Sequence, residues 1–336
     1  MVRVSVFSRL IKVHMSPGEK QLRLKIIIAF ALVYVFWGST YLAMRIAVMD
    51  IPPLSMTGLR YLIAGPIMLA WCLISGRTVR ITKADFIRVL IIGVLLLTGG
   101  NVIVAWSEKY LASGLASLIV AIVPLWVAVV EGPVLKLDRL NSRGWFGLLL
   151  GIVGLGVLLW PKIATSSAMG RMELTAALVL ILGSLSWSCG SLASRYFKLS
   201  IGPMAATGWE MTLAGMVNMS LAFAVGDQHH IRWTGRGIGA VLYLVVFGSW
   251  VGFTAYIWLL DNVPAAKVAT YAYVNPVVAV FLGWLILHER VDAFILAGTI
   301  VIVAAVALVT SSKTKAKHGT DSAAAPQLPA CEVGAD

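Results

Sequence analysis

Residues 37–45, WGSTYLAMR, return 150 positions later as residues 187–195, WSCGSLASR. The segment GLRYLIAG at 58–65 aligns at the same spacing with GWEMTLAG at 208–215. At spacings of 150 to 152, the aligned pairs include Trp37 with Trp187, Arg60 with Glu210, Trp106 with Trp258, and Pro124 with Pro276. A period of this length is far longer than that of a solenoid repeat. The chain is therefore predicted to be a tandem duplication of one half-protein.

Composition indicates what kind of half-protein was duplicated. Hydrophobic residues make up 59% of the chain and charged residues only 12%, about half the usual charged share of a soluble domain. Ten apolar stretches of about 20 residues are each long enough to cross a bilayer as a helix. They lie near 25–47, 54–75, 87–107, 112–131, 143–160, 172–193, 203–225, 237–260, 265–287 and 292–310. The sequence predicts an all-α integral membrane protein with ten transmembrane helices.

The predicted spans also suggest a topology. Five spans fall in each copy, and an odd number inserts the second copy upside down relative to the first, giving two inverted five-helix repeats. Most Lys and Arg residues then lie in the predicted cytoplasmic segments if the N-terminus is inside, as the positive-inside rule requires. We expect a cytoplasmic segment at 1–24, repeats at 25–160 and 172–310, and a disordered cytoplasmic tail at 311–336. Both termini are predicted to be cytoplasmic.

Four segments resemble the EamA family of the drug/metabolite transporter superfamily. They are WGSTYLA at 37–43, LRYLIAG at 59–65, LGSLSWSCGSLASRY at 182–196 and TYAYVNPVVAVFLGWLILHER at 270–290. The resemblance implies a multi-pass protein of the bacterial inner membrane that exports small organic solutes from a central cavity. It does not identify the solute, which could be an amino acid, a metabolite or an amphipathic drug. One departure is KLDR at 136–139, where the family commonly has a Gly-Glu-Arg type helix end.

Two matching polar stripes are candidates for the lining of that cavity. Trp37, Thr40 and Tyr41 fall at helical spacing on the first span, and Trp187 and Ser191 fall on the equivalent sixth span. An aromatic ring with nearby hydroxyl groups suits an amphipathic solute, because the ring supplies apolar area and the hydroxyls orient the ligand. The alternative is that both tryptophans pack at helix contacts and the small residues permit close approach.

Arg60 and Glu210 place opposite charges at equivalent positions within spans, where a charge needs a partner or water. About 10 Å of depth is expected between their backbones, from their positions along the helices. Arg60 either faces the bundle or extends its flexible stem toward the outer headgroups. Glu210 has a shorter reach, and we hypothesise that it faces the cavity and exchanges a proton or a cationic substrate during transport.

Four further polar residues are substrate-binding candidates. Asn101 lies in the third span, Tyr256 in the eighth, and Tyr273 and Asn275 in the ninth. Tyr273 and Asn275 are two residues apart, so a regular helix directs them to different faces. The aligned prolines, Pro124 and Pro276, each remove a backbone hydrogen bond and can bend their helices.

The residue inventory does not favour an enzyme. The five histidines lie in predicted loops or tails, and neither an HExxH motif nor a phosphate-binding GxxxxGK[ST] loop is present. We expect no cofactor, no metal and no nucleic-acid partner. Gly147 and Gly151 form a GxxxG motif, which predicts helix contact, either within the chain or between the subunits of a homodimer.

The predicted function is secondary transport. We expect export of a small organic solute by alternating access, driven by protons, by exchange or by the gradient of the solute. The alternatives are an uncoupled facilitator or channel and a lipid flippase.

Overall fold

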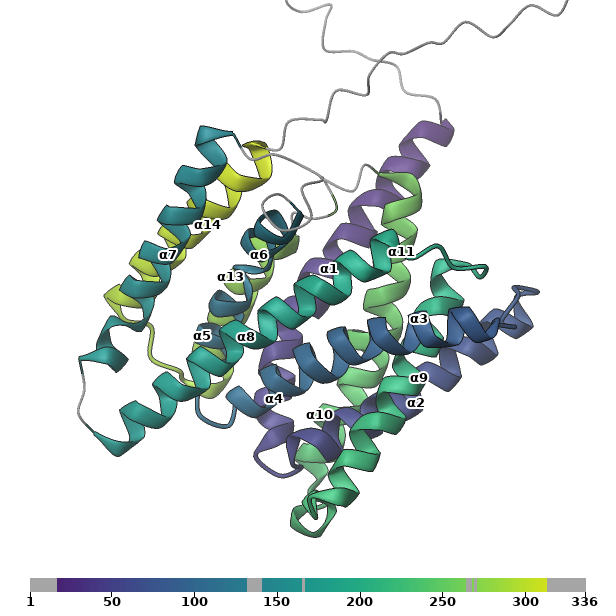
Figure 1. The fold of residues 1–336 in the computed structure, drawn as a ribbon, viewed down its shortest axis with the longest axis horizontal. Helices are drawn as coiled ribbons and strands as arrows, with labels where there is room; N and C mark the ends of the chain where they lie inside the picture. Colours follow the sequence, from purple (N-terminus) through teal and green to yellow (C-terminus); the bar gives the residue numbers. More distant parts are fainter. Residues whose placement is uncertain (1–16, 132–140, 165–166, 264–267, 269–270, 313–336) are drawn as a thin grey trace, which may run out of the picture.

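The computed structural model describes residues 17–131, 141–164, 167–263, 268 and 271–312, and within these ranges its regular secondary structure is helical (Figure 1). The helices of the first half are α1 Pro17–Val48, α2 Pro53–Ile74, α3 Lys83–Gly93, η1 Val94–Val102, α4 Ile103–Ser107, α5 Ser113–Val120, α6 Val123–Val129 and α7 Ser142–Ile163. Those of the second half are α8 Ala168–Tyr196, α9 Pro203–Ala224, η3 Asp227–His230, α10 Gly235–Tyr243, η4 Leu244–Val251, α11 Gly252–Asn262, α13 Tyr271–Leu287 and α14 Ala293–Ser312.

The order of helices repeats between the two halves. α2 and α9 each begin at a proline, and their bounds differ by 150 residues. A π-helical segment interrupts the third span of each half, η1 in one and η4 in the other, and these segments also start 150 residues apart. The predicted duplication is therefore present in the helices themselves, down to an irregular turn that the sequence did not suggest.

The helix ends mostly follow local sequence signals. The Thr82 side chain caps α3 in a capping box with Asp85, and the Thr234 side chain caps α10. Pro124 lies in the first turn of α6, after α5 has ended at Val120, so the predicted span at 112–131 is two short helices. Pro276, in contrast, lies inside the continuous helix α13.

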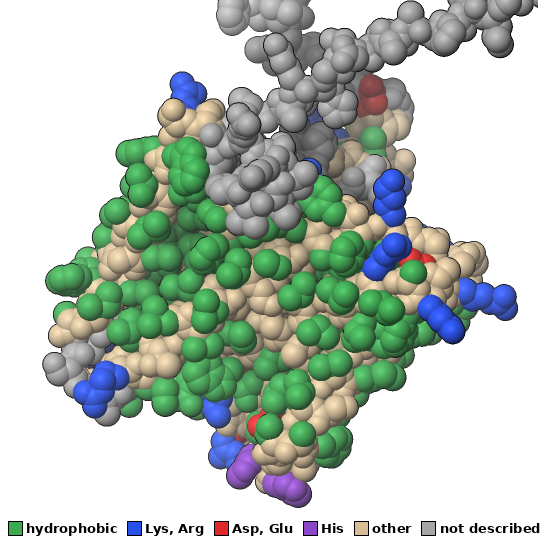
Figure 2. All heavy atoms as spheres, viewed as in Figure 1, with side chains coloured by type: hydrophobic (Ala, Val, Ile, Leu, Met, Phe, Trp, Pro, Cys, Tyr) green, Lys and Arg blue, Asp and Glu red, His purple; other side chains and the backbone are tan. Residues whose placement is uncertain are grey.

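Among the described residues, six helical segments are long and apolar enough to cross a membrane, by length and composition. They are Gly18–Val48, Pro53–Ile74, Lys83–Ser107, Ser142–Pro161, Met169–Tyr196 and Gly235–Leu259; the shorter apolar helical segments there are Ser113–Val129, Val274–Leu287 and Ala293–Val309. Hydrophobic side chains cover the middle of the face in Figure 2, with basic and histidine side chains at its margins. Large apolar side chains are also exposed elsewhere in the sequence of helices, for example Ile74 of α2, Ile152 of α7 and Ile300 of α14. Such a surface fits hydrocarbon, since soluble proteins rarely expose large apolar patches.

Equivalent helices of the two halves pack directly against each other. A Cβ atom placed on Gly65 of α2 would lie 2.6 Å from the backbone nitrogen of Thr212 in α9. A Cβ atom on Gly215, the equivalent of Gly65, would lie 2.7 Å from the backbone nitrogen of Leu62. Residue numbers rise along α2 as those of the facing residues fall along α9, so the two helices run antiparallel. Glycine is required at both positions because the backbones are nearly in contact.

α7 and α14 form a second pair of equivalent helices, at the opposite edge of the bundle in Figure 1. Gly147 of α7 faces Ala305 and Val309 of α14, and Gly298 of α14 faces Leu158 of α7. These contacts also run antiparallel. The GxxxG motif therefore makes a helix contact within the chain, one of the two alternatives that the sequence left open.

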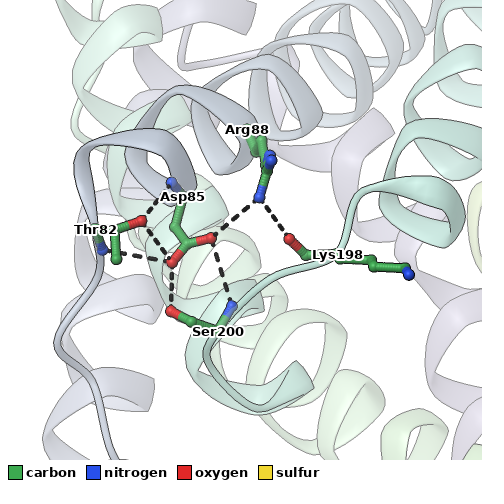
Figure 3. A network of polar contacts seen from close by, with 5 residues as sticks. All are labelled: Thr82, Asp85, Arg88, Lys198 and Ser200. Carbon is green, nitrogen blue, oxygen red and sulfur yellow. Dashed lines mark hydrogen bonds and ion pairs between the residues drawn. The ribbon is translucent and has the colours of Figure 1, made fainter.

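Polar contacts tie the two halves together at the ends of the helices. Figure 3 shows the Asp85 carboxylate between Thr82 and Ser200, where it accepts hydrogen bonds from both hydroxyl groups. Arg88 lies 3.7 Å from the same carboxylate and donates a 2.6 Å hydrogen bond to the carbonyl of Lys198. These contacts join the start of α3 to the segment between α8 and α9.

An equivalent cluster joins the segment between α1 and α2 to the start of α10. Asp50 accepts a 2.7 Å hydrogen bond from the Thr234 hydroxyl and forms ion pairs with Arg232 and Arg236. Asp50 is equivalent to Ser200, and Thr234 is equivalent to Thr82. In the first cluster the carboxylate belongs to α3, as Asp85, and in the second it belongs to the segment between α1 and α2, as Asp50. Both clusters link the two halves.

Candidate functional site

Trp37 of α1 is the centre of an aromatic cluster in the bundle. Its ring lies 5.2 Å from that of Phe253 and 5.0 Å from those of Tyr256 and Tyr271, measured between centroids. The indole nitrogen donates a 3.2 Å hydrogen bond to the carbonyl of Gly248. Three helices, α1, α11 and α13, therefore place aromatic rings around one point, and two of the candidates named from the sequence, Trp37 and Tyr256, are in contact there.

Arg60 of α2 contacts the π-helical segment η4 at the same glycine, Gly248, that accepts the hydrogen bond from Trp37. A Cβ atom on Gly248 would lie 3.1 Å from the Nη2 atom of Arg60 and 2.8 Å from the methyl group of Thr40. Trp37, Thr40 and Arg60 all reach this one glycine, and we call them, with Tyr256, the Gly248 site. The Thr40 hydroxyl donates a 2.6 Å hydrogen bond to the carbonyl of Trp37.

The Arg60 side chain is directed into the bundle and is only 3% exposed. Its Nε atom donates a 2.9 Å hydrogen bond to the Ser249 hydroxyl, and its Nη1 atom lies 3.9 Å from the sulfur of Met44. The guanidinium also lies over the ring of Tyr61, 5.0 Å from its centroid. Among the described residues no carboxylate pairs with Arg60, so Arg60 and Glu210, which place opposite charges at equivalent positions, do not form an ion pair.

The equivalent site of the other half also packs its tryptophan against a glycine, as Trp37 does at Gly252, but it has Glu210 in place of Arg60. Trp187 of α8 packs against Gly100 of η1, where a Cβ atom would lie 2.9 Å from the indole ring. The Ser191 hydroxyl donates a 2.8 Å hydrogen bond to the carbonyl of Trp187. Glu210 is 7% exposed, and its backbone packs against Gly93 of α3. These residues lie on α8 and α9, whereas the aromatic cluster around Trp37 is carried by α1, α11 and α13.

The remaining predicted residues are more dispersed. Tyr41 is partly buried against the main hydrophobic cluster. Asn101 lies in η1 and Asn275 in α13, and the side-chain oxygen of each is buried without a hydrogen-bond partner among the described residues. Tyr273 lies in α13, but its side chain is outside the described residues.

Glu108 is a buried carboxyl group that the sequence reasoning missed. It directly follows α4 and is fully buried, and neither of its carboxyl oxygens has a hydrogen-bond partner among the described residues. Burial raises the pKa of Glu108 well above its ordinary value; Arg45 lowers that pKa and Glu289 raises it. The sequence shows only an acidic residue directly after an apolar span. Such a residue is typical of a helix end that is exposed to water, so it gave no sign of burial.

Replacing Glu108 with Gln is expected to flatten the pH dependence of stability. Because the folded pKa is raised, the unfolded chain ionises first, so stability is greatest below the ordinary value of about 4.5 and falls as pH rises toward the folded pKa. The slope from one group is up to about 1.4 kcal/mol per pH unit. Thermal unfolding midpoints of the detergent-purified protein across pH measure this component. A wild-type slope in Glu108→Gln would contradict the prediction.

The residues present offer no evident metal centre. Among the described residues, no group of three or more His, Cys, Asp or Glu side chains is arranged to hold a metal ion. The Gly248 site instead combines a guanidinium, a hydroxyl and aromatic rings, which are groups that bind an organic solute by charge, hydrogen bonds and apolar contact.

Comparison with known proteins agrees with a transport protein. The sequence model of the EamA-like transporter family matches twice, at residues 24–160 and 174–311. The inner membrane transporter YedA of Escherichia coli K12, described as uncharacterized, is 36% identical over 287 residues, covering 84% of this chain and 90% of YedA. The uncharacterized transporter YoaV of Bacillus subtilis is 24% identical over 293 residues, covering 87% of this chain and 99% of YoaV.

A solved structure, titled only as the crystal structure of a protein, has a similar fold. Its TM-score is 0.60 at 18% sequence identity, and the match covers 88% of this chain and 99% of that chain. The two family matches correspond to the two halves that the repeated sequence motifs and the repeated helices define. Since those matches extend over most of its length, the chain belongs to the EamA-like transporter family.

Proposed function

We propose that this protein exports a small organic solute across the inner membrane by alternating access, with the Gly248 site as part of the solute-binding site. The chain crosses the bilayer ten times, and repeats at 25–160 and 172–310 have inverted orientations. Both termini then lie in the cytoplasm. The family contains transporters, which makes transport the shared starting point, while the solute, the coupling and the mechanism belong to this proposal.

The antiparallel contact between α2 and α9 is the observation that carries the proposal. Gly65 and Gly215 are equivalent residues, and at each of them the backbone of the facing helix comes into direct contact. Self-matching contact of this kind is what a two-fold axis across the bundle produces, and such an axis inverts one repeat relative to the other. Two inverted halves can exchange their conformations, so a site between them can open to either side of the membrane at similar free energy.

A counterflow experiment tests the transport mechanism. Purified protein in proteoliposomes, loaded with unlabelled solute, should accelerate the entry of the same labelled solute, and the flux should saturate. A carrier requires both results, because each solute must wait for the site to return to the same side. A flux that is proportional to concentration and insensitive to internal solute would support a channel. Movement of labelled lipid between leaflets, without solute flux, would support a flippase.

Glu210 is the proposed proton-coupling residue. Its carboxyl group is buried in α9 and forms no hydrogen bond or ion pair with another described residue, so it is free to gain and lose a proton as its surroundings change. Glu210→Gln should therefore transport solute by exchange but lose the stimulation by a proton gradient. Glu108→Gln is the matched control, since it removes another buried carboxyl group. If a proton gradient still drives transport in Glu210→Gln, Glu210 is not the coupling group.

A further inference from the structure

We infer that Arg60 binds the carboxylate of the exported solute and that Trp37 receives its apolar body, so the solutes are organic acids. This inference rests on the proposed transport function and specifies the chemical class that the Gly248 site selects. It starts from Arg60, the one Lys or Arg side chain that is buried in the part of the chain that the structure describes.

The guanidinium of Arg60 has more donors than the protein satisfies. An arginine side chain offers five N–H groups in a planar fork. The hydroxyl of Ser249 accepts one of them, and the sulfur of Met44 is a weak acceptor at 3.9 Å. The ring of Tyr61 adds a contact with the face of the cation. Every described partner of Arg60 is therefore electrically neutral, and donors remain for another acceptor.

An uncompensated cation at this depth is costly. Arg60 is 3% exposed, and removing a charge from water without an opposite charge costs several kcal/mol. Charged residues within membrane helices pair with an opposite charge or mark the path of a substrate. A carboxylate on the solute would supply the missing charge and would match the fork of the guanidinium through two parallel hydrogen bonds. The unfilled donors thus favour an anionic group over an ammonium group.

The Arg60 guanidinium lies directly against the backbone of Gly248. A Cβ atom at Gly248 would be 3.1 Å from the Nη2 atom, so a larger residue there would crowd the guanidinium. The carbonyl of the same glycine accepts the hydrogen bond from Trp37. A ligand at Arg60 therefore lies beside the indole ring, and the rings of Tyr256 and Tyr271 extend the apolar surface from there.

The other half does not repeat this arrangement. Glu210 replaces Arg60, and at a spacing of 152 Asn101 replaces Phe253 and Val104 replaces Tyr256. Duplication has kept the tryptophan on each side but has left the guanidinium and the ring cluster on only one. We therefore expect one acid to bind per chain, and to bind in one orientation, with its carboxylate at Arg60 and its apolar body at Trp37.

Matched acids and amides test the inference. The full-length protein in detergent is incubated with phenylacetate, hydrocinnamate or hexanoate, and in parallel with the carboxamide and the amine of the same carbon skeleton. At least one acid should raise the thermal unfolding midpoint, and its amide and amine should not. Arg60→Gln should weaken binding of that acid about 10- to 100-fold, which corresponds to the loss of hydrogen bonds to a charged group. Arg143→Gln, the same change at an exposed arginine in the first turn of α7, should retain it.

Several results would overturn the inference. They are stabilisation by the amide as strong as that by the acid, stabilisation by none of the acids, and unchanged affinity for the acid in Arg60→Gln. If Arg60→Gln does not fold, the comparison of acid with amide in the wild-type protein decides alone. Counterflow separates the two proposals: exchange of amines or neutral solutes without acids would reject only the acid class. Absence of exchange for every solute would reject carrier transport itself.

Discussion

Gly65→Leu should prevent the two halves from packing, and it is the substitution with the largest expected effect on folding. Even a Cβ atom at Gly65 would lie 2.6 Å from the backbone nitrogen of Thr212 and 2.9 Å from the carbonyl oxygen of Gly208. Neither backbone atom can rotate away as a side chain would. Overpacking in a core commonly costs about 1–3 kcal/mol, and a full leucine against backbone should exceed that range. The expected result is little or no monodisperse protein in size-exclusion chromatography of the solubilised membranes.

Gly156→Leu is the matched control for that experiment. Gly156 also lies within a membrane-crossing helix, α7, but it is exposed and no atom lies within 4 Å of a Cβ atom placed there. The same change should leave the yield and the elution profile close to wild type. Normal elution of Gly65→Leu would show that α2 and α9 do not pack at backbone distance, and the two-fold arrangement would lose its main support.

Glu289→Ala should give the second largest effect, through the start of α5. The Glu289 carboxylate accepts hydrogen bonds from the backbone nitrogen of Ser113 at 2.8 Å, from the Ser113 hydroxyl at 2.9 Å and from the backbone nitrogen of Gly114 at 3.3 Å. These groups are at the first turn of a helix, whose N–H groups have no partner within the helix. Loss of a charged acceptor of several bonds should destabilise the protein by about 2 kcal/mol or more. Unfolding of the purified protein by heat measures the change.

Asp292→Ala provides the comparison for Glu289→Ala. Asp292 accepts a single 2.8 Å hydrogen bond from the backbone nitrogen of Ile295 at the start of α14, and it is exposed. Removing it should cost about 1 kcal/mol, as for an ordinary helix cap. Equal losses in the two variants would mean that Glu289 serves only its own loop and does not hold α5 in the other half.

Glu289 also explains the HER sequence that ends the ninth span. Gly283 leaves room for the carboxylate, since a Cβ atom there would collide with it and lie 2.8 Å from the Ser113 hydroxyl. His288 adopts a positive φ of 54°, which turns the chain after α13. The motif appeared in the sequence as a helix end, and the contact across the halves emerged only in the structure. Its first-half counterpart, within KLDR at 136–139, lies outside the described residues.

The helical spans were predictable because they depend on local composition. The apolar stretch at 54–75 became α2 at Pro53–Ile74, and the stretch at 203–225 became α9 at Pro203–Ala224. α1 begins earlier than the predicted span, at Pro17, because its polar first turns can form helix without being apolar. The π-helical segments η1 and η4 were not predictable, since they depend on how the third span of each half meets its neighbours.

The candidate site was predictable in part. Helical spacing placed Trp37 and Thr40 on one face, and both reach the Gly248 site. Whether Arg60 faces the bundle or extends toward the outer headgroups depended on which way its long side chain turns, and the structure directs it to Ser249. Glu108 was missed because its burial comes from neighbouring helices and not from its own segment.

By itself, the sequence determined that this protein is a duplicated, helical membrane protein, because repeats and hydrophobic length are properties of consecutive residues. Only the tertiary structure decided that Arg60 meets Ser249 and Gly248 without an acid, and that Trp37 gathers three aromatic rings. The reason is physical: such contacts join residues roughly 190 to 230 positions apart, and the packing of glycine-lined helices sets which of them meet.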